Sequence, residues 1–168
     1  MNSVSRDSTT DRRLILIVDD DIEGEMASLV PLLEMEGFRV AATKGYCDTE
    51  DICRKLQEKG TAPAVAIIDV ILAILDPRDK AEIRNPRLAG NKVTQLVLSF
   101  FPETRVILLT VVDEVALPRS LRNKVRAVIN RPADWEKILS AITHVLASPS
   151  GGNQSSDTSA EQTGKPRC

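Results

Sequence analysis

The sequence lacks both a strong net charge and a long apolar run. Its 168 residues contain 22 lysines and arginines against 24 aspartates and glutamates, so the formal net charge is -2. Such a small charge produces no strong field to attract nucleic acid or an anionic membrane. The longest apolar runs, such as Leu14–Val18, are too short for a membrane span, and Met1–Arg13 lacks the apolar core of a signal peptide. We therefore expect a cytoplasmic protein that binds neither nucleic acid nor a membrane.

Cysteine and histidine are also too few to suggest familiar sites. Cys47, Cys53 and Cys168 form an odd set without C-x-x-C spacing, which predicts reduced thiols and neither a disulfide framework nor a zinc site. The only histidine, His144, falls in a helical pattern, and we interpret it as a partly exposed helix residue without a catalytic role.

Five short apolar runs predict β-strands. Each is nearly continuous, which is typical of parallel strands covered on both faces. The runs are Leu14–Val18, Phe38–Ala42, Ala64–Ile68, Val106–Leu109 and Ala127–Ile129. Helical patterns alternate with them at 22–33, 93–100 and 135–146, and more weakly at 48–59 and 113–123. This alternation predicts an α/β fold with a doubly wound, five-stranded parallel sheet, and Pro31 predicts a kink or a boundary in the first helix.

Two segments interrupt the regular alternation. Val70–Gly90 is much longer than a usual strand-to-helix turn and mixes prolines with charges of both signs, so we expect an exposed insertion. We hypothesise that Asp76–Pro86 contributes to a partner-binding surface, although a neutral surface loop is an alternative. Ser148–Cys168 is rich in small polar residues and predicts a disordered tail. With a flexible segment at 1–13, one domain is expected over residues 14–147.

Polar residues follow four of the five predicted strands. Ligands of doubly wound sheets bind beyond the carboxyl ends of the strands, so these residues are candidates for one site. Taken singly, each has a simpler explanation, such as a helix cap or a turn. The four strand ends are Asp19-Asp20-Asp21, Asp69, Thr110 and Asn130-Arg131-Pro132.

Together, these residues predict a metal and phosphoryl site. Two carboxylates about 5 Å apart repel by roughly 3 kcal/mol at an effective dielectric near 20, so converging aspartates need a cation or a shared proton. Mg²⁺ suits Asp19, Asp20 and Asp69, because it prefers hard oxygen ligands. The Thr110 hydroxyl and the Arg131 guanidinium would complete a site for a phosphoryl group.

The strand-end motifs resemble those of a known family, the receiver domains of response regulators in two-component signalling. The order and coarse spacing of the motifs agree over residues 14–147, which implies a flavodoxin-like (βα)5 receiver fold. The matching motifs are Leu-Ile-Leu-Ile-Val-Asp-Asp-Asp at 14–21, Ile-Ile-Asp-Val at 67–70, Val-Ile-Leu-Leu-Thr at 106–110 and Asn-Arg-Pro at 130–132.

The resemblance also implies a role for each site residue. Asp69 would accept a phosphoryl group from a histidine kinase or a histidine-containing phosphotransfer protein, and Thr110 would bind the phosphoryl oxygens. Asp19, Asp20, Asp69 and the backbone carbonyl of Ile71 would hold Mg²⁺. The domain would then be a signalling module, not an enzyme, and it would act through a downstream protein partner, since the chain after residue 147 is too short for a DNA-binding output domain.

Several residues depart from the family pattern. Arg131 replaces the usual lysine, Val128 replaces the usual switch aromatic, and Val111 replaces a small residue. Because arginine presents a planar fork, we hypothesise that Arg131 makes two charge-assisted bonds to Asp69 and slows its phosphorylation.

Two alternatives remain open at this stage. The first is a degenerate receiver that acts as a phosphorylation-independent interaction module. The second is a phosphatase of the haloacid-dehalogenase type, which also uses an aspartate nucleophile. Such enzymes usually need a second aspartate two residues later, where this chain has Ile71.

Overall fold

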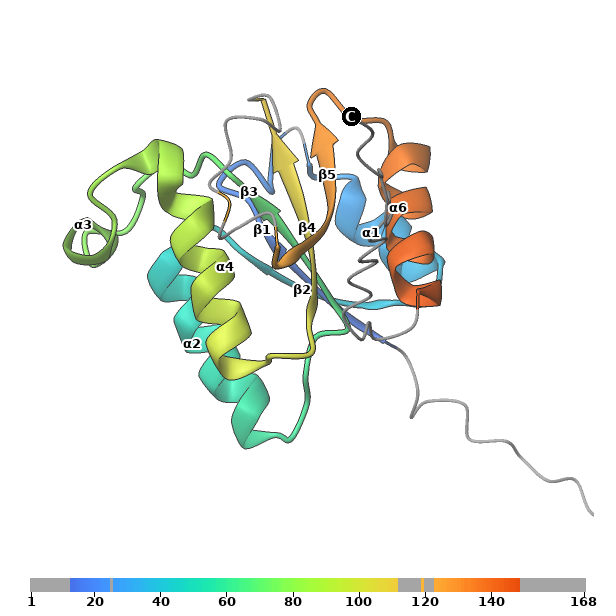
Figure 1. The fold of residues 1–168 in the computed structure, drawn as a ribbon, viewed down its shortest axis with the longest axis horizontal. Coiled ribbons are helices and arrows are strands. Elements are labelled where there is room, and N and C mark those ends of the chain that lie inside the picture. The colour runs from blue at the N-terminus through green and yellow to red at the C-terminus, as the bar shows by residue number, and fades with distance from the viewer. Residues whose placement is uncertain (1–12, 25, 112–118, 120–122, 149–168) are drawn as a thin grey trace, which may run out of the picture.

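A computed structural model describes residues 13–24, 26–111, 119 and 123–148, and it confirms the predicted parallel sheet (Figure 1). All four neighbouring strand pairs are parallel, in the order β2-β1-β3-β4-β5. The strands are β1 (Leu14–Val18), β2 (Arg39–Thr43), β3 (Val65–Asp69), β4 (Arg105–Thr110) and β5 (Val125–Asn130). The chain order reverses beside β1, where a doubly wound sheet opens its ligand crevice.

Two apolar clusters cover the two faces of the sheet. On one face, α2 (Tyr46–Glu58) and α4 (Ala89–Phe100) pack on strand residues such as Leu16 and Ile68. On the other face, α1 (Leu29–Met35) and α6 (Trp135–Ala147) pack on residues such as Ile17 and Ile67. Figure 1 shows the resulting three layers, with α2 and α4 on the opposite side of the sheet from α1 and α6. Neighbouring strand residues therefore face different clusters, which explains the continuous apolar runs.

The first helix begins later than its apolar pattern indicates. Residues 20–24 and 26–28 form turns, and α1 starts only at Leu29, two residues before Pro31. In a longer helix, the nitrogen of Pro31 would have to bond to the carbonyl of Ala27, but proline has no N–H. Within the first turn that donor is not needed. The predicted boundary effect of Pro31 is therefore present, while Ile22 and Met26 still pack into the core.

The insertion at 70–90 is less exposed than its composition suggests. It contains two short helical segments, α3 (Asp79–Glu82) and η1 (Pro86–Leu88). Leu72 and Ile83 are buried in the same apolar cluster as α2 and α4, and the Leu72 N–H donates to the Pro86 carbonyl at 3.3 Å. The prediction of an exposed insertion holds for most of residues 73–87, whereas these apolar side chains anchor the segment to the core.

A buried carboxylate of the insertion caps helix α2. Asp79 is only 1% exposed, and its Oδ1 accepts a hydrogen bond from the backbone N–H of Cys47 at 2.8 Å. Gly45 occupies the N-cap position and has no side chain to do this. A Cβ at Gly45 would lie 2.4 Å from Asp79 Oδ2, so the glycine also makes room for the carboxylate. Asp79 thus supplies from the insertion the negative charge that a helix N-terminus favours.

Replacing Asp79 by alanine should destabilise the fold. The substitution leaves a buried N–H of α2 without its acceptor, so we expect a loss of about 1 to 2 kcal/mol in the free energy of unfolding. Urea denaturation followed by circular dichroism measures this loss. Glu82→Ala is the matched control, because Glu82 lies exposed in the same short helix. Equal stability of the two variants would show that Asp79 does not anchor the insertion.

The structure also describes two of the three cysteines and the single histidine. Cys47 and Cys53 are buried free thiols, and burial raises their pKa values, to about 12 for Cys47 and about 11 for Cys53. His144 is exposed on α6, as expected. The predicted helix at 113–123 falls mainly outside the described residues, as do Cys168 and nearly all of the predicted terminal segments. No helix in the described part of the chain is long and apolar enough to cross a membrane.

Candidate functional site

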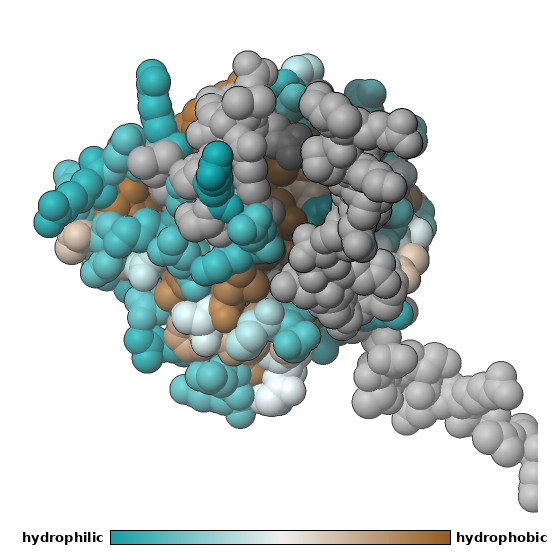
Figure 2. All heavy atoms as spheres, in the orientation of Figure 1, coloured by the Kyte–Doolittle hydropathy of each residue, from teal (hydrophilic) through white to brown (hydrophobic). Residues whose placement is uncertain are grey.

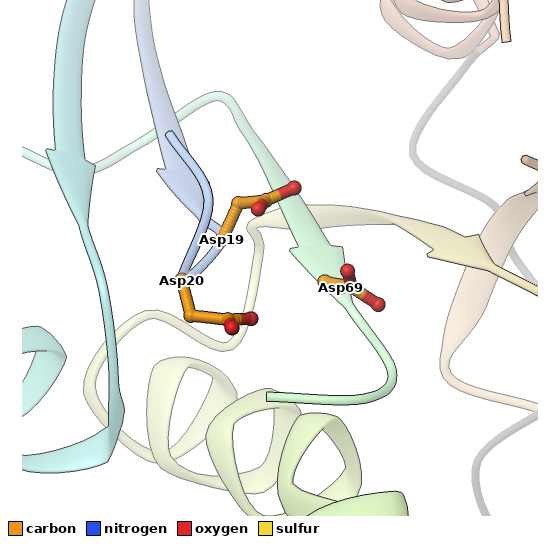
Figure 3. A group of neighbouring side chains, drawn as sticks. All are labelled: Asp19, Asp20 and Asp69. Atoms are coloured by element: carbon orange, nitrogen blue, oxygen red, sulfur yellow. The ribbon is translucent and has the colours of Figure 1, made fainter. Parts of the chain in front are cut away.

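The three predicted aspartates meet at the carboxyl ends of β1 and β3. Asp69 is the last residue of β3, Asp19 directly follows β1, and Asp20 comes next in the turn. One carboxylate oxygen from each residue lies within 4.8 Å of the other two. Figure 3 shows the side chains of Asp19 and Asp20 directed from β1 toward β3, where Asp69 lies. The topology therefore brings together residues that are about fifty positions apart in the sequence.

Arg131 bridges two of these carboxylates. Its Nη1 donates to Asp69 Oδ2 and its Nη2 donates to Asp19 Oδ2, both at 2.6 Å. Its backbone N–H donates to the Thr110 carbonyl at 2.8 Å, which places the residue at the end of β4. The hypothesis of two bonds to Asp69 was wrong in detail, because the two arms of the guanidinium divide between Asp69 and Asp19.

The remaining oxygens of the bridged pair are also hydrogen-bonded. Asp19 Oδ1 accepts from the Asp21 N–H and Asp69 Oδ1 accepts from the Ile71 N–H, both at 2.9 Å. All four carboxylate oxygens of Asp19 and Asp69 therefore have a donor. The sequence predicted that converging aspartates need a cation or a shared proton, and it assigned the role of the cation to Mg²⁺. The guanidinium of Arg131 supplies a positive charge within the chain itself.

Burial sets the proton affinity of the two bridged carboxylates. It is the main reason why the pKa of Asp69 rises to about 6 and why that of Asp19 is also raised. The N–H of Ile71 and the charge of Arg131 oppose the rise at Asp69, while the charges of Asp19 and Asp20 add to it. Asp69 consequently exchanges its proton closer to neutral pH than an exposed aspartate does.

The three carboxylates fit the coordination of a divalent cation such as Mg²⁺. Asp20 is half-buried, and within the described residues its carboxylate has no hydrogen-bond or ion-pair partner. A carboxylate oxygen has two lone pairs, so the oxygens of Asp19 and Asp69 can accept an N–H and still coordinate a metal. Three hard oxygen ligands at one point suit Mg²⁺. The contribution of the Ile71 carbonyl stays a prediction.

Thr110 and Val128 lie on the neighbouring strands β4 and β5. Thr110 is fully buried at the end of β4 and pairs in register with Asn130 of β5. Its contact with a phosphoryl group stays a prediction. Val128 is half-buried in β5 and packs against the cluster beneath α2 and α4, whereas Val111 is exposed.

Gly90 is a positioning residue that the sequence argument missed. Its N–H donates to the carbonyl of Val70, the residue after Asp69, at 3.0 Å. A Cβ at Gly90 would lie 2.4 Å from the carbonyl oxygen of Asp69 and 2.6 Å from the Cα of Val70. Helix α4 can therefore approach the backbone of Asp69 only because this residue has no side chain. A glycine at the start of a helical pattern was the available signal.

Comparisons with known proteins agree on the fold. No protein-family model matches the sequence, and no curated protein matches it significantly. A CheY-like response regulator receiver domain from Methanospirillum hungatei is 21% identical, with a TM-score of 0.60 over 81% of this chain and 94% of that chain. A receiver domain from Clostridium thermocellum is 18% identical, with a TM-score of 0.60 over 80% and 94%.

A third similar structure carries a modified site. It is a response regulator from Burkholderia pseudomallei, described with a phosphorylated aspartic acid, a calcium ion and citrate. It is 18% identical, with a TM-score of 0.58 over 77% of this chain and 65% of that chain. With the strand order described above, these likenesses give the chain the flavodoxin-like fold of response-regulator receiver domains.

Proposed function

We propose that this chain is an atypical, cytoplasmic receiver domain that accepts a phosphoryl group on Asp69 and signals through a protein partner. The convergence of Asp19, Asp20 and Asp69 at the carboxyl ends of β1 and β3, within a receiver fold, carries the proposal. The donor would be a histidine kinase or a phosphotransfer protein. The phosphorylated aspartate of the similar Burkholderia protein supports the same chemistry here.

The residues of the chain divide the reaction between them. A carboxylate oxygen of Asp69 would attack phosphorus and form the acyl phosphate, while the bond from phosphorus to the donor breaks and its electron pair leaves with the donor. Asp69 must be deprotonated, and Oδ2 must lose its bond to Arg131 if it is the attacking atom. Arg131 could then donate to a phosphoryl oxygen. Mg²⁺ held by Asp19, Asp20 and Asp69 would neutralise charge on the phosphoryl group.

A phosphorylation-independent interaction module is the second candidate. The observation that favours it is the complete hydrogen bonding of Asp19 and Asp69 by Arg131, Asp21 and Ile71. In this alternative, Arg131 permanently replaces the metal and holds the site in one state. The phosphatase alternative gains no support, since position 71 offers only the N–H of an isoleucine to Asp69.

Incorporation of phosphate from a small acyl phosphate tests the proposed function. We expect labelling that requires Mg²⁺ and disappears in Asp69→Asn. Absence of labelling in the unaltered protein, at any Mg²⁺ concentration, would favour the interaction module.

The same assay tests the metal assignment. Within the cluster, Asp20 is the one carboxylate that has no hydrogen-bond or ion-pair partner among the described residues. Because its oxygens would serve the metal alone, Asp20→Asn should raise the Mg²⁺ concentration needed for half-maximal labelling by about tenfold. Direct calorimetric titration with Mg²⁺ should show the same weakening without any phosphodonor. Unchanged affinity in Asp20→Asn would show that the cluster is not the metal site.

A further inference from the structure

The insertion forms a fixed platform beside the candidate site. Asp79 ties it to the start of α2, and Ile83 is buried in the apolar cluster. Arg78 adds ion pairs to Asp76 at 2.7 Å and to Asp51 of α2 at 3.2 Å. These contacts hold the backbone of the segment at a defined position relative to the domain.

Several cations on this platform have no partner among the described residues. Some exposed cations elsewhere in that part of the chain pair, as Lys44 does with Glu23 and Arg54 with Glu50, and others do not. On the platform and the adjoining helix α4, four exposed cations form no ion pair or side-chain hydrogen bond with any described residue. These are Lys80, Arg84, Arg87 and Lys92.

Two of these cations border a hollow of about 440 Å³ between the insertion and α4. Its lining comprises Ala81, Glu82, Ile83, Arg84, Asn85 and Lys92. Arg84 and Lys92 provide two positive charges, and Glu82 is the single acidic residue of the lining. In Figure 2, the side of the molecule where Figure 1 places α3 is mostly hydrophilic with small apolar areas. The hollow thus combines positive edges with some apolar surface.

We propose that this hollow binds an acidic segment of a protein partner, with carboxylates pairing to Arg84 and Lys92. The volume accommodates a few side chains, since ligand pockets of roughly 300 to 1,000 Å³ are common. A protein segment fits better than nucleic acid, because a nucleic-acid backbone needs a continuous positive groove, whereas this hollow offers only two cations beside one carboxylate. The inference rests on the proposed function only in assuming signalling through a protein partner, and it does not require phosphorylation.

Binding of a simple acidic probe tests the proposal. The probe is a fluorescein-labelled peptide of glutamate and leucine, and its binding to the full chain is followed by fluorescence anisotropy at low ionic strength, where surface charge pairs are least screened. Reversing both charges, in the double variant Arg84→Glu with Lys92→Glu, should weaken binding about tenfold. A peptide with glutamine in place of glutamate should bind more weakly than the acidic probe.

A matched control separates a local site from the overall field of the protein. Arg13→Glu with Arg39→Glu makes the same change in net charge at exposed positions just before β1 and at the start of β2. Because the strands are parallel, this is the opposite end of the sheet from the end of β3, where the insertion begins. The control variant should bind the acidic peptide with nearly unchanged affinity.

The remaining outcomes would overturn the proposal. These are equal weakening in both double variants, equal binding of the glutamine peptide, tighter binding of single-stranded DNA of the same charge, or no binding of the acidic peptide. Circular dichroism must first show that both variants are folded. Asp69→Asn should bind the peptide normally, so failure of the labelling experiment and failure of this one are distinguishable.

Discussion

Arg131→Lys is expected to increase the rate of Mg²⁺-dependent phosphorylation of Asp69 by a small acyl phosphate by about tenfold. The arginine contacts Asp69 and Asp19 at the same time, whereas the compact ammonium of lysine does not present the same planar fork. A hydrogen bond to a charged group contributes about 1.5 to 3 kcal/mol, and a change of about 1.4 kcal/mol in the activation barrier alters a rate tenfold. Weaker restraint of the acceptor should therefore speed the reaction.

The comparison requires matched Mg²⁺ concentrations and a blank. Asp69→Asn provides the blank, since it keeps an isosteric side chain without the nucleophilic carboxylate. Equal or slower labelling of Arg131→Lys would refute the restraining role of arginine. If neither protein incorporates phosphate, Arg131 does not control a reaction, and the interaction module becomes the better account of the site.

Gly90→Ala should destabilise the protein by about 3 kcal/mol, although alanine is the better helix former by about 1 kcal/mol. The added Cβ would overlap the Asp69 carbonyl and the Val70 Cα, which are backbone atoms at the end of β3 and directly after it. Relief of the overlap requires α4 or the end of β3 to move. Urea denaturation should show the lower stability, and phosphate labelling should fall because Asp69 is displaced.

Gly24→Ala is the corresponding control. There the new Cβ would meet the exposed side chain of Asp21, which can rotate away. We expect the stability of this variant to change by less than about 1 kcal/mol. If Gly90→Ala were as stable as Gly24→Ala, close approach of α4 to the backbone of Asp69 would not matter to the fold.

The sheet could be predicted from the sequence because its central strands β1, β3 and β4 are buried on both faces. Leu14–Val18 was placed without error, and β5 was underestimated by three residues, since its ends include exposed residues such as Arg126. Periodicity at Ile22 and Met26 correctly indicated burial, yet these residues lie in turns. The apolar pattern indicates which side chains are buried. A helix over residues 22–33 would also need a backbone N–H at Pro31, which proline lacks.

The residues of the candidate site could be predicted from the sequence, but their hydrogen bonds could not. Parallel topology brings Asp19, Asp20 and Asp69 to the same end of the sheet, so their proximity followed from the strand assignment. The partition of the Arg131 guanidinium between two carboxylates depends on side-chain conformation and on the anchoring of its backbone to Thr110. No spacing in the sequence encodes that arrangement.

The anchoring of the insertion was hidden for a different reason. Asp79 looks like one more charge in a polar, proline-containing segment, and its partner Cys47 is 32 residues away. The available indication was Gly45, a residue without a capping side chain at the start of a helical pattern. Recognising that α2 needed an external cap would have pointed to an acidic residue elsewhere in the chain.

The bonds of Arg131 also bear on the order in which the protein folds. They join residues separated by 62 and 112 positions, from the last strand to the first and the third. Contacts across such long loops carry a large closure entropy, so they form only when β5 has docked on the sheet. We therefore expect the guanidinium bridge to be absent from the folding transition state. The bonds of Arg131 would then lower the unfolding rate of the native domain and leave its folding rate unchanged.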